Sequence, residues 1–265
     1  MKNFLLAKAA YYMYLERDEG TETNLLSYIK ERIIAEKEAI EKLVEITHEE
    51  IDLDKIIELF NVEEVYKSSK KMTMVNDFIS GVLVTPKGVI VKEETTINEV
   101  VKYYITALNT RNAVIIKDIN YNEASVKNLI LLIFHEAMKK FEVDEKLIQL
   151  LPNEGIDESE VYNFEENRNN YVYLEDKKYI GEKNEGCIVL EGNIDDVIEK
   201  INIEGRANGA IIYTSNKDKA YKFLNRVNAK NVFVNAGIVN AKEAEVSEWV
   251  INKNVIYPMP QKLKS

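Results

Sequence analysis

Apolar side chains recur at helical spacing in the first 80 residues. Between residues 23 and 51 they fall mostly three or four positions apart, with charged side chains between them, as at Leu26, Ile29, Ile33, Ile34, Ile40, Leu43 and Val44. A stripe of this kind predicts an amphipathic helix with one solvated face. We therefore expect residues 1–80 to form helices joined by polar turns.

The period of the pattern changes at residue 80. The run SGVLVTPKGVIVK (80–92) predicts two short strands around a turn at Pro86–Gly88. Thr96 and Glu99 form a capping-box pattern, in which Thr96 accepts from the amide of Glu99. The elements expected next are a helix, a buried strand, a second helix and a third apolar run, at 97–108, 112–118, 122–141 and 146–152. Strands that alternate with helices at these lengths predict a parallel sheet with right-handed crossovers.

A second α/β unit is predicted after residue 184. Asn193 is expected to cap a helix whose first turn carries Asp195 and Asp196. The strands and helices of this unit are expected in alternation at 187–192, 193–202, 210–215, 216–228 and 231–237. The acidic, Asn-rich segment before it is interpreted as a connection that can carry one hairpin. The predicted organisation is thus a first region at 1–155, a connection at 156–183 and a second region at 184–265 that ends in a late strand.

Composition and charge narrow the class of protein. The chain is 46% apolar and 30% charged, which is ordinary for a globular protein with a sizeable core. Its net charge of −10 repels nucleic acid and anionic lipid, so neither is expected as a partner. We expect no signal peptide, since the N-terminus lacks an apolar h-region, and the single cysteine fits a reducing cytoplasm. The ten glycines form no G-x-G-x-x-G or P-loop pattern, which argues against a phosphate-cradling loop.

Two blocks of the chain resemble the aldehyde dehydrogenase superfamily. VTPKGVIV, NEVVKYYITALNTRNAVIIKD and LIQLLP are similar to the first half of its cofactor domain, and NIDDVIEKIN with GRANGAIIYTS to the end of its catalytic domain. The glutamate-5-semialdehyde dehydrogenase (γ-glutamyl phosphate reductase) branch and the CoA-acylating enzymes are the nearest in character. The resemblance implies an α/β fold of two halves with mostly parallel sheets, a Rossmann-like first half and NAD or NADP as cofactor. It also implies a homo-oligomer, or association with a full-length relative, through the C-terminal strand.

The resemblance does not extend to the segment that carries the catalytic residues of the family. The family carries a glycine-rich stretch, a general-base glutamate and a nucleophilic cysteine after the segment that resembles LIQLLP, and here about thirty polar residues (153–183) stand there instead. This departure implies an internally shortened, catalytically inactive relative of an oxidoreductase. Two alternatives stay open, namely an active oxidoreductase whose rearranged site uses Cys187, and a non-catalytic oligomerisation or interaction module.

The candidate site residues bear on these alternatives. Cys187 begins an apolar strand near Glu185 and Glu191, which oppose thiolate formation, so no catalytic residue is assigned. By resemblance, Lys117 matches the lysine that contacts the adenosine ribose or its phosphate, and Thr95 the asparagine that helps hold the oxyanion. The alternatives are a strand-end lysine in water and a threonine that only precedes a helix cap. The two histidines, His48 and His135, are far apart in sequence, and no metal site is predicted.

Overall fold

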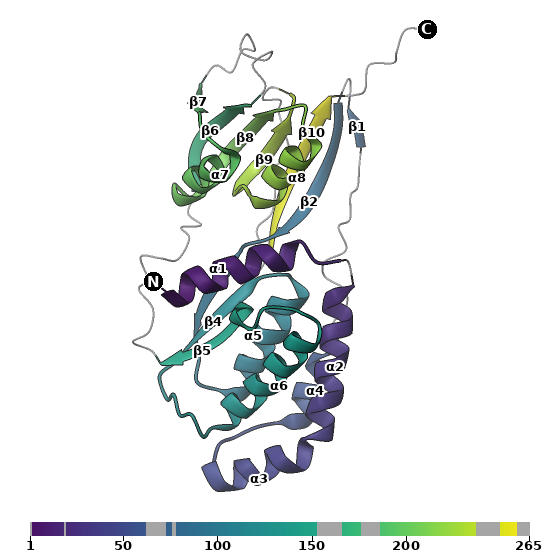
Figure 1. Cartoon of the computed structure of the whole chain (residues 1–265), viewed down its shortest axis with the longest axis vertical. Helices are drawn as coiled ribbons and strands as arrows, with labels where there is room; N and C mark the ends of the chain where they lie inside the picture. Colours follow the sequence, from purple (N-terminus) through teal and green to yellow (C-terminus); the bar gives the residue numbers. More distant parts are fainter. Residues whose placement is uncertain are drawn as a thin grey trace. The chain divides into compact units, whose positions relative to one another are not determined.

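The chain divides into two compact units in the computed structural model (Figure 1). The first unit consists of Met1–Lys67 and Pro86–Val161, and the second of Ser68–Thr85 and Tyr162–Ser265. The residues that the structure describes are 2–18, 20–61, 73–75, 78–152, 166–175, 186–236 and 250–258.

A three-stranded parallel sheet forms the centre of the first unit. Its strands stand in the order β3 (Val89–Glu93), β4 (Ala113–Asp118), β5 (Ile148–Pro152). Helix α5 (Ile97–Asn109) connects β3 to β4, and α6 (Val126–Lys140) leads through the short helix η1 (Glu145–Leu147) to β5. Every residue of β4 is buried, as its apolar run predicts for a central strand. The predicted parallel sheet is confirmed.

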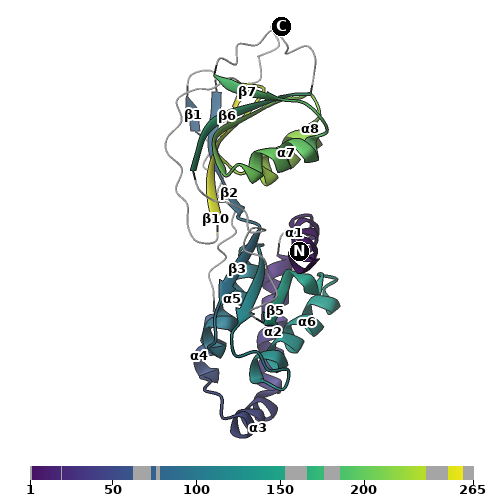
Figure 2. The same cartoon turned by 90° about the vertical axis from the view of Figure 1, so that its left-hand side faces the viewer.

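The N-terminal residues form helices that pack on this sheet or on its helices α5 and α6 (Figures 1 and 2). The helices are α1 (Lys2–Leu15), α2 (Thr21–Ala35), α3 (Lys37–Thr47) and α4 (Leu53–Leu59). Helix α1 contacts β3, β4 and η1, while α2 packs on α5 and α6. The amphipathic stretch at 23–51 is two helices rather than one, because the chain breaks at Glu36, and Ile34 is 48% exposed instead of facing inward.

The start of α5 differs from the sequence prediction. Thr96 is the N-cap residue, but its side chain makes no capping hydrogen bond to the helix. Its hydroxyl donates instead to Oε1 of Glu94 at 3.1 Å. The predicted capping box is therefore wrong, because Glu94 accepts from the Thr96 amide, the role expected of Glu99, and the Thr96 hydroxyl donates to Glu94 instead of accepting from the helix.

Among the described residues, the second unit contains a seven-stranded sheet. The strand order is β1-β2-β10-β9-β8-β6-β7, and the five strands from β10 to β7 are parallel. Their bounds are Thr73–Val75 (β1), Phe78–Pro86 (β2), Glu166–Leu174 (β6), Cys187–Leu190 (β7), Arg206–Tyr213 (β8), Ala229–Val234 (β9) and Val250–Pro258 (β10). Helices α7 (Ile194–Ile203) and α8 (Lys217–Arg226) lie on one face of this sheet (Figure 2).

An apolar core fills the space between this sheet and its two helices. Tyr171, Val232 and Phe223 belong to it and are fully buried. Helix α7 begins as predicted, since Oδ1 of Asn193 accepts from the amides of Asp195 and Asp196 at 2.9 and 3.0 Å. The local sequence signal was sufficient here because a cap needs only neighbouring residues.

Three segments pair differently from the sequence interpretation. The run at 80–92 does form two strands, but β2 joins the sheet of the second unit and β3 that of the first. The segment 156–183 contains β6, which lies between β8 and β7 in the sheet, so it is more than a connection. Strand β10 lies between β9 and β2, so the premise that the late strand has no partner in its own chain is wrong.

None of the helices in the described part of the chain is both long enough and apolar enough to span a membrane.

Candidate functional site

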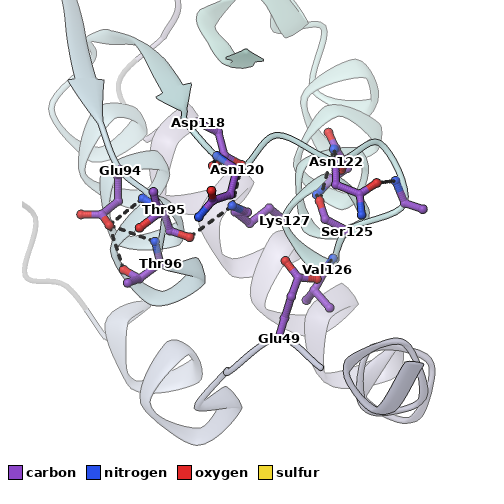
Figure 3. A network of polar contacts seen from close by, with 12 residues as sticks. Glu49, Glu94, Thr95, Thr96, Asp118, Asn120, Asn122, Ser125, Val126 and Lys127 are labelled. Carbon is purple, nitrogen blue, oxygen red and sulfur yellow. Dashed lines mark hydrogen bonds and ion pairs between the residues drawn. The ribbon is translucent and has the colours of Figure 1, made fainter. Parts of the chain in front are cut away.

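The strands β3 and β4 end side by side at the carboxyl edge of the first sheet. Glu93 pairs in register with Lys117, and the amide of Glu94 donates to the carbonyl oxygen of Lys117 at 3.1 Å. Open α/β sheets bind their ligands outside the carboxyl ends of the strands. Figure 3 shows the polar side chains that gather at this edge, and they define the candidate site.

The carboxylate of Glu94 occupies the start of α5. Its Oε1 accepts from the amides of Thr95 and Thr96 at 2.7 and 2.9 Å, in addition to the Thr96 hydroxyl. Partial burial opposes ionisation, but the hydrogen bonds from Thr96 and Thr95 and the charge of Lys127 outweigh it and lower the pKa of Glu94. Glu94 is therefore an anion at neutral pH, placed where the N-terminus of a helix favours negative charge.

A buried ion pair joins α6 to the end of β4. Nζ of Lys127 lies 2.5 Å from Oδ2 of Asp118, and the two side chains are 3% and 0% exposed. The same ammonium donates to the carbonyl oxygen of Thr95 at 3.1 Å, so it ties together the ends of both strands. Oδ1 of Asp118 accepts from the amide of Asn120 at 3.0 Å, which holds the turn that follows β4 (Figure 3). The ammonium of Lys127 is therefore already engaged by Asp118 and Thr95 and is not available to a ligand.

The N-terminus of α6 also carries a carboxylate from the chain itself. Oε2 of Glu49, in the loop between α3 and α4, accepts from the amide of Val126 at 2.7 Å (Figure 3). The N-cap residue Ser125 accepts from the amide of Asn128 at 3.3 Å. Amides at a helix N-terminus form a ready site for a phosphate or another anion. At this helix, Glu49 and Ser125 already fill that role.

The structure places the two residues predicted to bind a cofactor at the same edge, in different surroundings. Lys117 is 6% exposed, so it is not a strand-end lysine extended into water. Its neighbour in β4, Asp118, points to the opposite face of the sheet because side chains alternate along a strand. Thr95 is exposed and takes part through its backbone, whose amide donates to Glu94 and whose carbonyl accepts from Lys127. Their roles toward a cofactor stay predictions.

Four further residues of the edge, Glu94, Asp118, Lys127 and Glu49, were not singled out from the sequence. The sequence offered an indication for Asp118, since this acidic residue closes a strand that begins with four apolar residues. The sequence also offered an indication for Lys127, because a lysine in the first turn of a helix is unfavourable unless an anion is near. The sequence offered no indication for Glu49, since its hydrogen-bond partner Val126 lies 77 residues away.

The carboxyl edge of the second sheet carries charged groups that are likewise paired. The carboxylate of Glu175 accepts from the hydroxyl of Thr214 and from the ammonium of Lys219. The side chain of Asn235 accepts from the amide of Thr214 and donates to its carbonyl oxygen, both at 2.9 Å. Asn216 caps α8 through the amides of Asp218 and Lys219. These contacts join the ends of β6, β8 and β9 to the start of α8.

Cys187 lies at the first position of β7, at the opposite end of the strands. It is half-buried and packs against an apolar cluster on the sheet that includes Val172 and Phe233. Burial raises the pKa of this thiol above its ordinary value. A nucleophilic cysteine needs the opposite environment, with a nearby cation or base that favours the thiolate.

The histidines have no ligand set around them in the part of the chain that the structure describes. Nε2 of His135 lies 2.9 Å from the carbonyl oxygen of Ile148 and so links α6 to β5. His48 ends α3 in a left-handed conformation. Over the described ranges, no three His, Cys, Asp or Glu side chains gather in a way that could hold a metal ion.

Comparison with known proteins identifies the fold. No protein-family model and no curated protein matches the sequence. Among solved structures, γ-glutamyl phosphate reductase from Saccharomyces cerevisiae has a TM-score of 0.53 at 14% identity, over 100% of this chain and 98% of that chain. Aldehyde dehydrogenase 21 from Physcomitrella patens has a TM-score of 0.53 at 10% identity, over 98% and 90%. The glyceraldehyde-3-phosphate dehydrogenase GapN from Methanocaldococcus jannaschii, complexed with NADP, has a TM-score of 0.50 at 14% identity, over 86% of this chain and 61% of that chain.

These likenesses are structural, because the sequence identities are low. The class they define is an α/β protein with the fold of the aldehyde dehydrogenase superfamily. The γ-glutamyl phosphate reductase structure stands among the similar ones, as the resemblance of the sequence predicts. A shared fold does not transfer an activity, which depends on the residues of the site.

Proposed function

We propose that this chain is an aldehyde dehydrogenase-like protein that does not catalyse the NAD(P)-dependent reaction at an aldehyde or acyl group. The observation that carries the proposal is that side-chain carboxylates of the chain bind backbone amides at the carboxyl edge of the first sheet. The amides of Thr95, Thr96 and Val126, which open α5 and α6, are hydrogen-bonded to Glu94 and Glu49. Three amides beside the starts of α5 and α6, where an anionic ligand would be favoured, are thus bound by carboxylates of the same chain.

A dinucleotide fits this edge only in part. Its pyrophosphate needs free backbone amides and the close approach that glycines allow. Here two carboxylates hold those amides and would repel the phosphates. The cation of Lys127 is paired with Asp118. By resemblance, the cation expected to contact a ribose or phosphate is Lys117. We therefore derive no step through NAD or NADP, and expect weak affinity that depends on Lys117.

The state of the single thiol supports the same proposal. The superfamily reaction, by the resemblance, needs a cysteine nucleophile, and the sequence holds only Cys187. Because burial raises its pKa, the thiol is protonated at neutral pH and is a poor nucleophile.

A turnover assay separates this proposal from its alternatives. The chain is incubated with NAD or NADP and a panel of aldehydes, and formation of reduced cofactor is followed by absorbance, with Cys187→Ser as the matched variant. We expect no turnover from either protein. Turnover that is lost in Cys187→Ser would establish the alternative of a rearranged site that uses this thiol. Turnover that both proteins share would also overturn the proposal.

Self-association and a cytoplasmic location are part of the proposal. Strand β10 has neighbours on both sides, so strand pairing between copies through this sheet would use β7 or β1, its outer strands among the described residues. In β7, Ile188 and Val189 are 42% and 56% exposed, which leaves an apolar edge of the kind that proteins usually cover. Sedimentation velocity tests this part, and a monomer at high micromolar concentration would contradict it.

A further inference from the structure

A hollow of about 320 Å³ opens in the first unit, away from the carboxyl edge of its sheet. It lies between the end of α1 and the turn that joins α6 to η1, and η1 leads into the amino end of β5. A volume near 300 Å³ is at the lower end of the range for small-molecule sites. The hollow therefore suits a compact ligand rather than a dinucleotide.

The floor of the hollow is apolar and fixed in place. Tyr14 is 2% exposed, and its hydroxyl donates to the carbonyl oxygen of Leu108 at 3.3 Å, so the ring cannot turn away. Val143 is buried beside it, while Met13 is 51% exposed and leaves its thioether free to cover a ligand. Methionine adapts well to apolar groups of different shape.

One cation on the rim makes no direct contact with a carboxylate in the described residues, although its charge contributes to lowering the pKa of Glu145. Lys139, in the last turn of α6, makes no hydrogen bond and no ion pair through its ammonium within the described residues. Arg17 stands near it, with Nη1 3.5 Å from Oε2 of Glu142 and Nη2 donating to the Glu142 carbonyl oxygen. The rim can therefore offer two cations to an incoming carboxylate, and only one of them is already engaged.

The opposite part of the rim is acidic. Oδ1 of Asp144 accepts from the amide of Lys146 at 2.9 Å, but among described residues its carboxylate forms no ion pair. Glu145 is already bound to the ammonium of Lys146 at 2.9 Å, and this contact is the main reason that its pKa is lowered. Asp144 is thus the carboxylate that remains for an ammonium group.

We propose that this hollow binds a free α-amino acid with an apolar side chain. The ligand carboxylate would lie against Lys139 and Arg17, the ammonium against Asp144, and the side chain on Met13 and Tyr14. A purely anionic ligand is disfavoured, because the rim holds more carboxylates than cations. A zwitterion satisfies both unpaired charges at once and is neutral overall. This site is independent of the proposed function.

Three related probes test the charge requirement on the full chain. L-leucine, L-leucinamide and 4-methylpentanoate share one side chain, but leucinamide lacks the carboxylate and 4-methylpentanoate lacks the ammonium. Each is titrated into ¹⁵N-labelled protein, and the amide resonances of Val143, Asp144 and Glu145 are followed. We expect saturable shifts with leucine, and affinities about tenfold weaker for each of the other two. The absence of saturable shifts with leucine, or equal affinity for all three probes, would overturn the proposal.

Two charge-removing variants give a crossed pattern that a structural effect cannot imitate. Lys139→Gln should weaken leucine and 4-methylpentanoate about tenfold while leaving leucinamide unchanged. Asp144→Asn keeps an N-cap side chain and should weaken leucine and leucinamide but not 4-methylpentanoate. Lys42→Gln on α3 is the control and should change none of the three. Equal losses for all probes in either pocket variant would contradict the assigned contacts.

Discussion

Oε2 of Glu49 accepts a 2.7 Å hydrogen bond from the amide of Val126, although the two residues lie 77 positions apart. The contact fixes the loop between α3 and α4 against the first turn of α6. It also places a carboxylate where an α/β sheet would offer free amides to an anion. The same bond therefore stabilises the fold and closes part of the candidate site.

Removal of this carboxylate should cost stability. Glu49→Ala leaves the Val126 amide without its acceptor, and loss of a helix cap costs about 1 kcal/mol. The free energy of unfolding from urea titration measures the change. Glu50→Ala is the matched control, since Glu50 is exposed and next in sequence, and it should stay within about 0.5 kcal/mol of the parent. Equal values for the two variants would show that the Glu49 contact contributes nothing.

Removal of one partner from the buried pair of Lys127 and Asp118 should lower the free energy of unfolding by far more. Lys127→Met leaves Asp118 charged and buried without its cation, which costs about 3–5 kcal/mol. The double variant Lys127→Met/Asp118→Asn removes both charges and should recover part of this loss. As a control, Lys102→Met breaks the exposed pair with Glu99 and should cost less than about 1 kcal/mol. A Lys127→Met protein as stable as the control would contradict the role assigned to the pair.

Local features of the fold were predictable, and contacts between distant segments were not. The alternation of strands and helices in the first unit and the Asn193 cap depend on spacing and on neighbours within a few residues. The parallel pairing of those strands follows from the alternation. Strand β6 was missed because its first half, ENRNN, is polar and reads as a loop. The partners of β10 are set by sheet pairing between segments far apart in the chain. In the candidate site, Lys117 and Thr95 were named by resemblance and their roles stay predictions. Glu94 went unrecognised because Thr96 offered a more familiar cap.

Lys253 should make stability depend on pH. This lysine of β10 is 2% exposed, and its ammonium donates to the carbonyl oxygens of Leu224 and Asn225 at the end of α8, at 3.1 and 3.3 Å. Burial, with the charge of Arg206, lowers its pKa to about 7. In the unfolded chain the pKa is about 10.4, so between these values the unfolded state binds a proton that the folded state does not. Stability from this group therefore rises with pH from about 7 to about 10 and is lost below about 7.

The variant Lys253→Met tests this dependence, because it keeps an unbranched side chain and removes the charge. It should be more stable than the parent at about pH 6 by a few kcal/mol, and the difference should shrink as the pH rises. Unfolding midpoints in urea, measured across this range, give the comparison. Lys200→Met on α7, at an exposed position, should leave the slope of the parent unchanged. If the stability of Lys253→Met depends on pH as steeply as that of the parent protein, another group causes the pH dependence.

The thiol of Cys187 should react slowly. Since burial raises its pKa, the thiolate fraction at neutral pH is small, and the alkylation rate of the folded protein should increase with pH beyond the usual thiol range near about 8.5. Mass spectrometry after timed exposure to iodoacetamide measures this rate. Rapid alkylation near about pH 6 that does not change with pH would mean that the thiol is activated.

The most direct test of the account is a calorimetric titration of the full chain with NAD and with NADP. With Glu94 and Glu49 in place, both should bind with dissociation constants in the millimolar range or weaker, and Lys117→Ala should remove the heat that remains. Glu94→Gln/Glu49→Gln removes the two negative charges and should strengthen binding of both nucleotides. Micromolar binding by the parent protein, unaffected by Lys117→Ala, would contradict the account, because it would place an intact cofactor site elsewhere in the chain.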